Sequence, residues 1–211
     1  MKKFLICCAL ALIFAFPASP SDGIETRTSA INKAYANLNS FTATFTQTLT
    51  NATAKTSETR TGTIHFKKPL LVRWESKGDS QELLIVTKKE VWDYFPDEEI
   101  AYRHPLSFAK DARTVIGIIT GQTTIESNFT VSSADASYQT LHLYPKDPTP
   151  QMTEVTIHID PKTNLIRTVE ITDFYNNTNK IEFDKMDTGV NLKDSIFAFT
   201  PPKGIKVQNP K

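Results

Sequence analysis

The sequence contains very little cysteine, and its two thiols, Cys7 and Cys8, both stand near the N-terminus. A chain that loses its first residues would have no thiol left, which excludes disulfides and thiol catalysis in the remainder. Positive and negative charges nearly cancel, with 24 basic and 23 acidic residues among 211. Because no basic stripe with interleaved aromatic residues is present, we expect no nucleic-acid partner.

Familiar catalytic motifs are also missing. The sequence has no G-x-S-x-G elbow, no H-E-x-x-H pair and no phosphate-binding loop. The four histidines fall on different expected strands or loops without the paired spacing of a metal site; they are His65, His104, His142 and His158. We therefore predict no catalytic residue, no metal and no cofactor, and interpret the protein as something other than an enzyme.

No hydrophobic run is long enough to span a membrane comfortably. The longest, Phe4 to Phe16, has 13 residues and follows Lys2 and Lys3, whereas a spanning helix needs about 20. The small residues of 17–21 come next, so residues 1–21 are predicted to be a cleaved export signal; an uncleaved anchor is the alternative. Ile6 and a short apolar stretch precede Cys7, which argues against lipidation. Residues 22–211 are predicted to form a single domain with a formal charge of about −1.

Apolar residues alternate with polar ones along much of the chain, as expected of strands with one buried face. The stretch 62–95 contains three or four such strands joined by tight turns, with an interruption at Pro69. Further strands are expected at 41–50, 100–103, 125–131, 141–143, 155–159, 165–174, 181–183 and 196–200.

Only two segments have helical spacing. One begins near Asp22 and ends near Leu38, and the other covers 108–119, between a possible cap at Ser107 and a C-terminal Gly121. About ten or eleven antiparallel strands with one apolar face and so few helices fit two folds. An unclosed barrel with helices over its mouth and a two-sheet sandwich with a solid core are both allowed.

Four sequence pieces, in order, resemble the LolA family of periplasmic lipoprotein carriers. They are Phe41-Thr-Ala-Thr-Phe45-Thr-Gln47, Lys68-Pro-Leu-Leu-Val72-Arg-Trp74-Glu, the Gln-Glu-Leu-Leu-Ile-Val strand followed by Val-Trp-Asp-Tyr-Phe-Pro, and Phe197-Ala-Phe-Thr-Pro-Pro-Lys-Gly204. The resemblance implies a mainly β fold with two or three short helices. It would be an unclosed antiparallel barrel of about 11 strands with a helical lid over an apolar cavity.

The same resemblance implies a function and its partners. The protein would be a monomeric periplasmic chaperone that binds the acyl chains of triacylated lipoproteins. It would receive them from an inner-membrane ABC-type exporter and deliver them to an outer-membrane receptor. Two alternatives stay open: a LolB-like receptor, which the missing lipidation site disfavours, and a carrier of another lipid or glycolipid.

Candidate binding residues follow from the matched motifs and from the second helix. The expected acyl-chain and lid residues are Phe45, Phe66, Val72, Trp74, Phe108, Val115, Ile116 and Ile119. Val72 stands where the family usually has Phe. Lys68 stands where the family usually has an Arg that ties the lid helices through hydrogen bonds to their backbone. Since Lys has no planar fork, we expect a weaker latch here, or one shared with Lys67.

Overall fold

The computed structural model describes residues 20–78, 80–110, 115–122 and 124–210. Its strands are β1 Ser40–Asn51, β2 Thr56–Lys67, β3 Leu71–Lys77, β4 Glu82–Val86, β5 Glu90–Phe95, β6 Ile100–Pro105, β7 Phe129–Ser133, β8 Thr140–Pro145, β9 Glu154–Ile159, β10 Ile166–Thr172, β11 Thr178–Thr188 and β12 Lys206–Gln208. Its helices are α1 Pro20–Asn37, α2 Ser107–Lys110, α3 Val115–Ile119 and α4 Ile125–Asn128, with short 3-10 turns η1 Pro96–Glu98 and η2 Asp194–Phe197. None of the described helices is long and apolar enough to cross a membrane.

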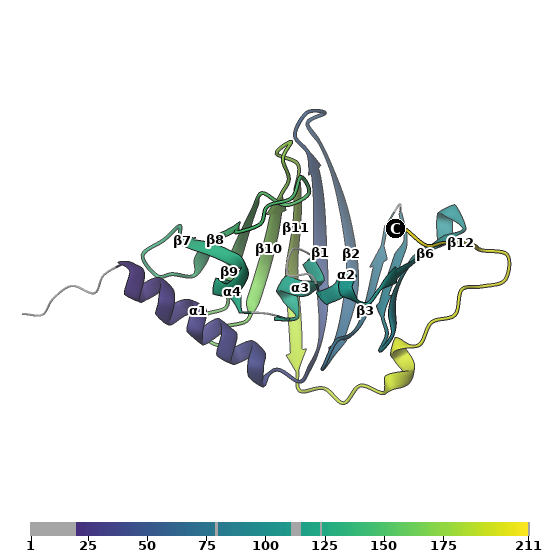
Figure 1. Ribbon diagram of the computed structural model, residues 1–211, viewed down its shortest axis with the longest axis horizontal. Coiled ribbons are helices and arrows are strands. Elements are labelled where there is room, and N and C mark those ends of the chain that lie inside the picture. The colour runs from purple at the N-terminus through teal and green to yellow at the C-terminus, as the bar shows by residue number, and fades with distance from the viewer. Residues whose placement is uncertain (1–19, 79, 111–114, 123, 211) are drawn as a thin grey trace, which may run out of the picture.

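All the described strands belong to one curved sheet that does not close on itself (Figure 1). Their order is β12-β6-β5-β4-β3-β2-β1-β11-β10-β9-β8-β7. Neighbours are antiparallel except for the short β12, which runs parallel to β6. The predicted unclosed barrel is therefore confirmed, with 12 strands in the described residues where about 11 were expected.

The concave face of the sheet carries the main core. In the central strand β1, Phe41, Ala43 and Phe45 are buried, while the threonines between them are partly or fully exposed. This is the two-residue period of a strand with one covered face. Phe41 lies opposite Phe66 of β2, with the two rings 5.3 Å apart. The same alternation continues on both sides and builds one apolar cluster.

The order of the strands explains where the helices lie. The chain builds β1 to β6 outward in one direction, and its next strand, β7, forms the far edge of the sheet. The connection between β6 and β7 contains α2, α3 and α4, and it passes over the concave face (Figure 1). Helix α1 crosses the same face. The helices therefore cover the apolar side of the sheet because the topology brings the chain across it.

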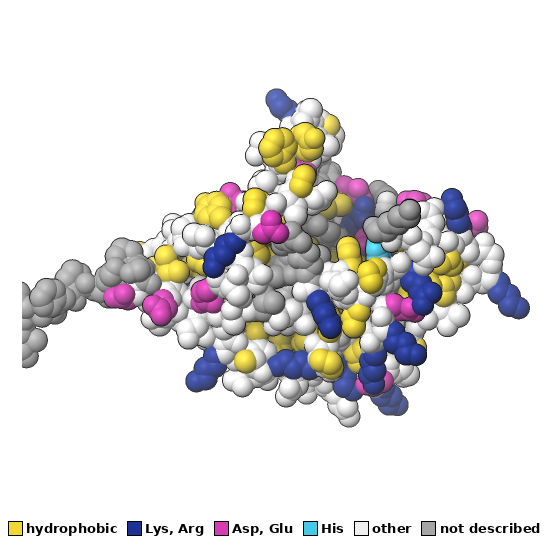
Figure 2. Space-filling model, viewed as in Figure 1, with side chains coloured by type: hydrophobic (Ala, Val, Ile, Leu, Met, Phe, Trp, Pro, Cys, Tyr) yellow, Lys and Arg dark blue, Asp and Glu magenta, His cyan; other side chains and the backbone are white. Residues whose placement is uncertain are grey.

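The C-terminal segment covers part of the opposite face of the sheet. Arg73 of β3 donates a hydrogen bond of 3.1 Å to the carbonyl of Ile196. The ring of Phe199 packs against Trp92 and Tyr94 of β5, at centroid distances of 5.7 and 5.6 Å. Charged side chains of both signs are spread over the visible surface (Figure 2), in keeping with the small net charge.

Four sequence-based expectations need correction or restriction. Ile125 was expected to begin a strand but lies in α4, where Asn32 of α1 accepts a hydrogen bond from its backbone N–H at 3.2 Å. The strand expected at 196–200 is wrong, because side-chain contacts hold that segment outside the sheet. The helix expected at 108–119 is present as α2 and α3, and 111–114 lie outside the described residues. The predicted signal segment lies almost entirely outside them too, and α1 begins at its last two residues.

Candidate functional site

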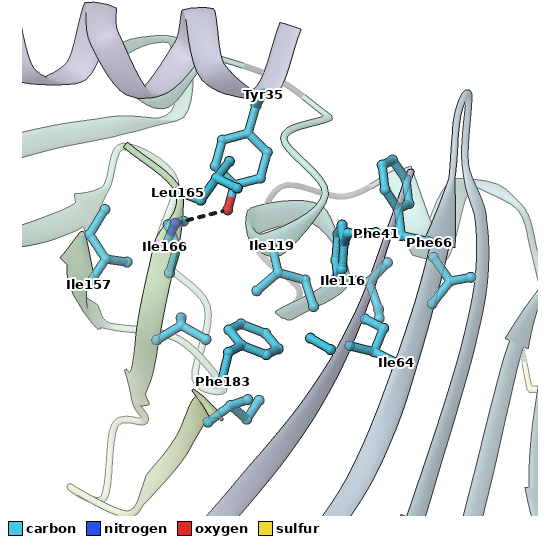
Figure 3. Close-up of a cluster of buried hydrophobic side chains, with 14 of the residues drawn as sticks. Tyr35, Phe41, Ile64, Phe66, Ile116, Ile119, Ile157, Leu165, Ile166 and Phe183 are labelled. Atoms are coloured by element: carbon cyan, nitrogen blue, oxygen red, sulfur yellow. Dashed lines mark hydrogen bonds between the residues drawn. The ribbon is translucent and has the colours of Figure 1, made fainter. Parts of the chain in front are cut away.

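Helix α3 inserts its aliphatic side chains into the concave core. Ile116 is 6% exposed and Ile119 is 1% exposed, and both belong to the main apolar cluster. Figure 3 shows them pointing toward the sheet, with Phe66 and Ile64 on one side and Phe183 on the other. A helix of five residues has little stability of its own, so α3 depends on this packing.

The C-terminal end of α3 is closed by backbone hydrogen bonds. The N–H of Gly121 bonds to the carbonyl of Ile118, and that of Gln122 bonds to the carbonyl of Gly117, each at 3.2 Å. Gly121 has φ +61°, the left-handed conformation that such a helix end requires. The predicted C-terminal glycine is confirmed.

A cavity of about 230 Å³ lies between α1 and α3. Tyr35 of α1 is buried beside it, and its hydroxyl accepts a hydrogen bond from the N–H of Ile166 at 3.2 Å (Figure 3). Burial raises the pKa of the Tyr35 phenol far above its usual value. The lining residues are Ile31, Asn32, Tyr35, Ala36, Gly117, Ile118, Gly121, Gln122, Thr124, Ile125, Phe129, Leu143 and Ile166.

A second cavity, of about 200 Å³, lies on the other side of α3. Its walls come from β1, β3, β4 and β11 of the sheet and from both α2 and α3. Most of its lining is apolar, with a smaller polar part. The lining residues are Gln47, Trp74, Glu82, Leu84, Phe108, Val115, Ile116, Asn179 and Ile181.

The second cavity brings together four of the predicted binding residues: Trp74, Phe108, Val115 and Ile116. Phe108 is 41% exposed and stacks on His104 at a centroid distance of 4.6 Å. It therefore stands at the edge of the cavity, where a ligand can reach it from solvent.

The other predicted apolar residues lie in the packed core instead of on a cavity wall. Phe45 contacts Trp74 with ring centroids 4.1 Å apart. Phe66, Val72 and Ile119 are buried in the same cluster. Phe45, Phe66 and Val72 come from the sheet and Ile119 from α3, and none of the four lines either cavity.

The turn between β2 and β3 is attached to two of the helices. Lys68 donates a hydrogen bond of 2.5 Å from Nζ to the carbonyl of Ala36, in the last turn of α1. The next residue, Pro69, accepts a hydrogen bond of 3.4 Å from Nε2 of Gln122, directly after α3. Lys67 is not part of this contact, because its ammonium binds Leu192 and Asp194 on the C-terminal segment.

Sequence reasoning missed several residues that line the two cavities. In the second cavity these include Gln47, Leu84 and Ile181, which lie on the concave side of their strands. The signal for Gln47 was present, because it follows Phe41, Ala43 and Phe45 at the same two-residue spacing. The cavity beside α1 could not be found from the sequence, since it depends on how α1 lies over α3.

Two acidic side chains, Glu82 and Asp93, lie against each other near the second cavity. Burial, together with the charge and the hydrogen bond of Glu82, raises the pKa of Asp93 to about 7. Burial also raises the pKa of Glu82, and Arg60, whose guanidinium lies 3.6 Å from that carboxylate, opposes the rise. Asp93 therefore keeps its proton below about pH 7.

The raised pKa of Asp93 predicts a pH-dependent stability. Between the ordinary value of 3.8 and about 7 the folded protein holds a proton that the unfolded chain releases, so stability falls as pH rises through this window. We expect the melting temperature to drop by several degrees from pH 5 to pH 8.5, and Asp93→Asn to reduce this drop. Asp184→Asn, at an exposed position, is the control; an unchanged pH profile in Asp93→Asn would contradict the assignment.

Comparison with known proteins agrees with this architecture. An outer-membrane lipoprotein carrier protein of Nitrosomonas europaea is 24% identical over 209 residues, covering 98% of each chain. A protein of the same name from Cronobacter sakazakii is 26% identical over 211 residues, covering 99% of this chain and 98% of the relative. The crystal structure of an uncharacterized conserved protein from Thermus thermophilus matches with a TM-score of 0.54 at 12% identity. That match covers 88% of this chain and 98% of the other and shows a shared fold.

The family model for the outer membrane lipoprotein carrier protein LolA matches residues 36–200. This range runs from the end of α1 to the segment after η2, so it contains α3, the whole lining of the second cavity, most of the lining of the first, and the turn at Lys68 and Pro69. The match therefore covers the structural features described above as well as most of the chain. The protein belongs to the LolA family of outer membrane lipoprotein carrier proteins.

Proposed function

We propose that this protein is a periplasmic chaperone that binds the acyl chains of lipoproteins and delivers them to an outer-membrane receptor. Family membership and the names of the relatives support the carrier role over that of a receptor. The structural observation that carries the proposal is the position of α3. Its aliphatic face fills the concave core, and an apolar cavity lies on each side of it.

The two cavities are too small for lipid chains while α3 stays in place. At about 230 and 200 Å³ they fall below the roughly 300–1,000 Å³ of typical ligand pockets. Movement of α3 away from the sheet would join them and add the space that Ile116 and Ile119 occupy. We therefore infer that α3 is a lid that occupies the binding site when cargo is absent.

A lid of this kind makes cargo binding reversible. Exposing two isoleucines costs roughly 3–6 kcal/mol, at about 1.5–3 kcal/mol for each side chain. About four to eight buried lipid CH₂ groups offset this, since each contributes about 0.8 kcal/mol. Loading therefore replaces one set of apolar contacts with another, and the cost of displacing α3 lowers the net affinity and favours release.

The predicted residues have distinct roles in this proposal. Trp74, Phe108, Val115 and Ile116 would contact acyl chains first, because they line the existing cavity. The packed residues Phe45, Phe66, Val72 and Ile119 would contact them once α3 has moved. Lys68 would act as the latch, since it joins the turn after β2 to α1.

The remaining features of the proposal follow from the carrier role. The cargo would be triacylated lipoproteins, handed over by an inner-membrane ABC-type exporter and accepted by an outer-membrane receptor. The carrier would work in the periplasm as a monomer, without cofactor or catalysis, after removal of residues 1–21. Residues 22–211 would form a single domain, because the strands β1 to β12 all belong to one continuous sheet.

The direct test is to identify what the protein carries. Native mass spectrometry of protein recovered from the periplasm should detect a complex with an acylated polypeptide, because the site is expected to hold cargo between the membranes. Recovery with a free lipid alone would indicate a carrier of another lipid. Recovery without any apolar ligand, even after an acylated peptide is added, would contradict the proposal.

The lid predicts that charge is tolerated on α3 but not on the sheet beneath it. In Ile116→Glu the helix can swing out and hydrate the carboxylate, so we expect binding of a hydrophobic probe dye to fall while the melting temperature changes by only a few degrees. Ile64→Glu is the matched control on β2, where the side chain is 0% exposed. An unpaired charge buried there costs several kcal/mol, so melting should collapse. A similar collapse in both variants would make α3 part of the fixed core.

The latch predicts that α1, the other helix over the concave face, opens faster when the hydrogen bond of Lys68 is removed. Lys68→Met keeps the aliphatic stem but loses the bond to the carbonyl of Ala36, a contact that contributes about 0.5–1.5 kcal/mol. We expect dye association to speed up severalfold with little change in melting temperature. Lys67→Met is the control, because Lys67 binds the C-terminal segment instead; equal effects of the two variants would refute a specific latch.

A further inference from the structure

One polar side chain stands where the apolar row of β1 reaches the second cavity. Gln47 follows Phe41, Ala43 and Phe45 on the concave face and is only 8% exposed. It lines the cavity of about 200 Å³ on the far side of α3 from α1. Burying an amide at the end of an apolar row costs free energy unless its polar atoms form hydrogen bonds.

Only one of the two polar groups of the Gln47 amide forms a hydrogen bond with a described residue. Its Nε2 donates a hydrogen bond of 2.9 Å to Oδ1 of Asn179 on the neighbouring strand β11. Its Oε1 is fully buried and accepts no hydrogen bond from any group in the described part of the chain. The contact with Asn179 fixes the amide plane, so Oε1 is held as an acceptor without a donor.

The surroundings of Gln47 restrict what could supply that donor. The apolar lining of this cavity comes from Trp74, Leu84, Phe108, Val115, Ile116 and Ile181. The acidic group on the wall, Glu82, already interacts with Arg60 and Asp93. A ligand that satisfies both the walls and Gln47 is therefore an apolar chain that carries a neutral N–H or O–H group.

We propose that Gln47 is a specificity-determining binding residue that accepts a hydrogen bond from an N–H or O–H group attached directly to an acyl or alkyl chain. The amide N–H of an N-acylated polypeptide terminus and the hydroxyl of a lipid both supply this chemistry. The inference rests on the proposed acyl-chain site, in which α3 moves away from the sheet, because a ligand can reach the fully buried Oε1 only in that open form. It adds to that site a preference for one kind of linkage. Cargo in which every chain is joined by an ester would leave Oε1 without a donor.

Matched ligand pairs test the preference in the intact protein. N-methyldodecanamide and methyl dodecanoate differ by N–H in place of O, and 1-dodecanol and dodecyl methyl ether test the hydroxyl. Affinities are measured by displacement of a hydrophobic fluorescent dye from wild type, Gln47→Met and Gln47→Glu. Met matches Gln in length without accepting a strong hydrogen bond, whereas Glu keeps an oxygen acceptor at the same place.

We expect Gln47→Met to lower the ratio of amide to ester affinity about two- to tenfold, the range of one neutral hydrogen bond. Affinity for the ester should stay within about twofold, and Gln47→Glu should keep the preference for the amide. The alcohol and ether pair shows whether Gln47 also accepts a hydrogen bond from a hydroxyl. A lower affinity ratio in Gln47→Met for either pair supports the site.

Ratios that do not change in Gln47→Met would overturn the inference while leaving the carrier function standing. The same loss in Gln47→Met and Gln47→Glu would also overturn it, because the effect would then come from packing. If none of the four ligands displaces the dye from wild type, both the acyl-chain site and this inference fail.

Discussion

The concave face of the sheet presents a continuous apolar surface, and the structure depends on keeping that surface away from water. Its buried side chains come from strands on both sides of β1, so no single strand pairing can cover them. Helices α1 and α3 provide the cover, with Tyr35 and Ile31 from one and Ile116 and Ile119 from the other. Apolar burial is roughly proportional to area and has no preferred direction. The same surface can therefore accept either helix side chains or lipid chains.

This property explains why a very short helix can have a central role. Helix α3 has five residues, far below the length at which an isolated helix is stable in water. Its backbone ends in hydrogen bonds around Gly121, and the side chain of Gln122 ties that end to the carbonyl of Pro69. These attachments contribute little compared with the burial of the two isoleucines, so whatever competes for the concave face also competes with α3. In the proposed mechanism, cargo binding and displacement of α3 are thus coupled by the same contacts.

Polar groups on the concave side modify this mainly apolar surface in two places. Glu82 and Asp93 share a buried site in which the pKa of both carboxyl groups is raised by burial. Gln47 lines the second cavity and has a buried amide oxygen that accepts no hydrogen bond from the described residues. Buried polar atoms of this kind destabilise an empty core. Their presence beside the cavity is understandable if the ligand has a polar part as well as acyl chains.

Much of the fold was predictable because strand alternation is a local property. The alternation of Phe41, Ala43 and Phe45 with threonines predicted β1, and the motif around Trp74 predicted the meander and the family. Two predictions were wrong: Ile125 was expected to begin a strand but lies in a helix, and 196–200 were expected to form a strand but lie outside the sheet. In each case a contact with a distant residue, Asn32 for Ile125 and Trp92 for Phe199, decides the local conformation. Such contacts leave no trace in local periodicity.

The sequence alone determined most of the strands, the helices at α1 and α3, the glycine that ends α3, and the apolar character of the residues that face inward. Only the tertiary structure decided which of those residues line a space. Trp74, Phe108, Val115 and Ile116 meet at a cavity, while Phe45, Phe66, Val72 and Ile119 fill the core around it. Both groups show the same hydrophobic pattern, because burial depends on the face of a strand or helix. Cavities depend on how closely separate elements approach, and that distance is set by the crossing of the chain from β6 to β7 over the sheet.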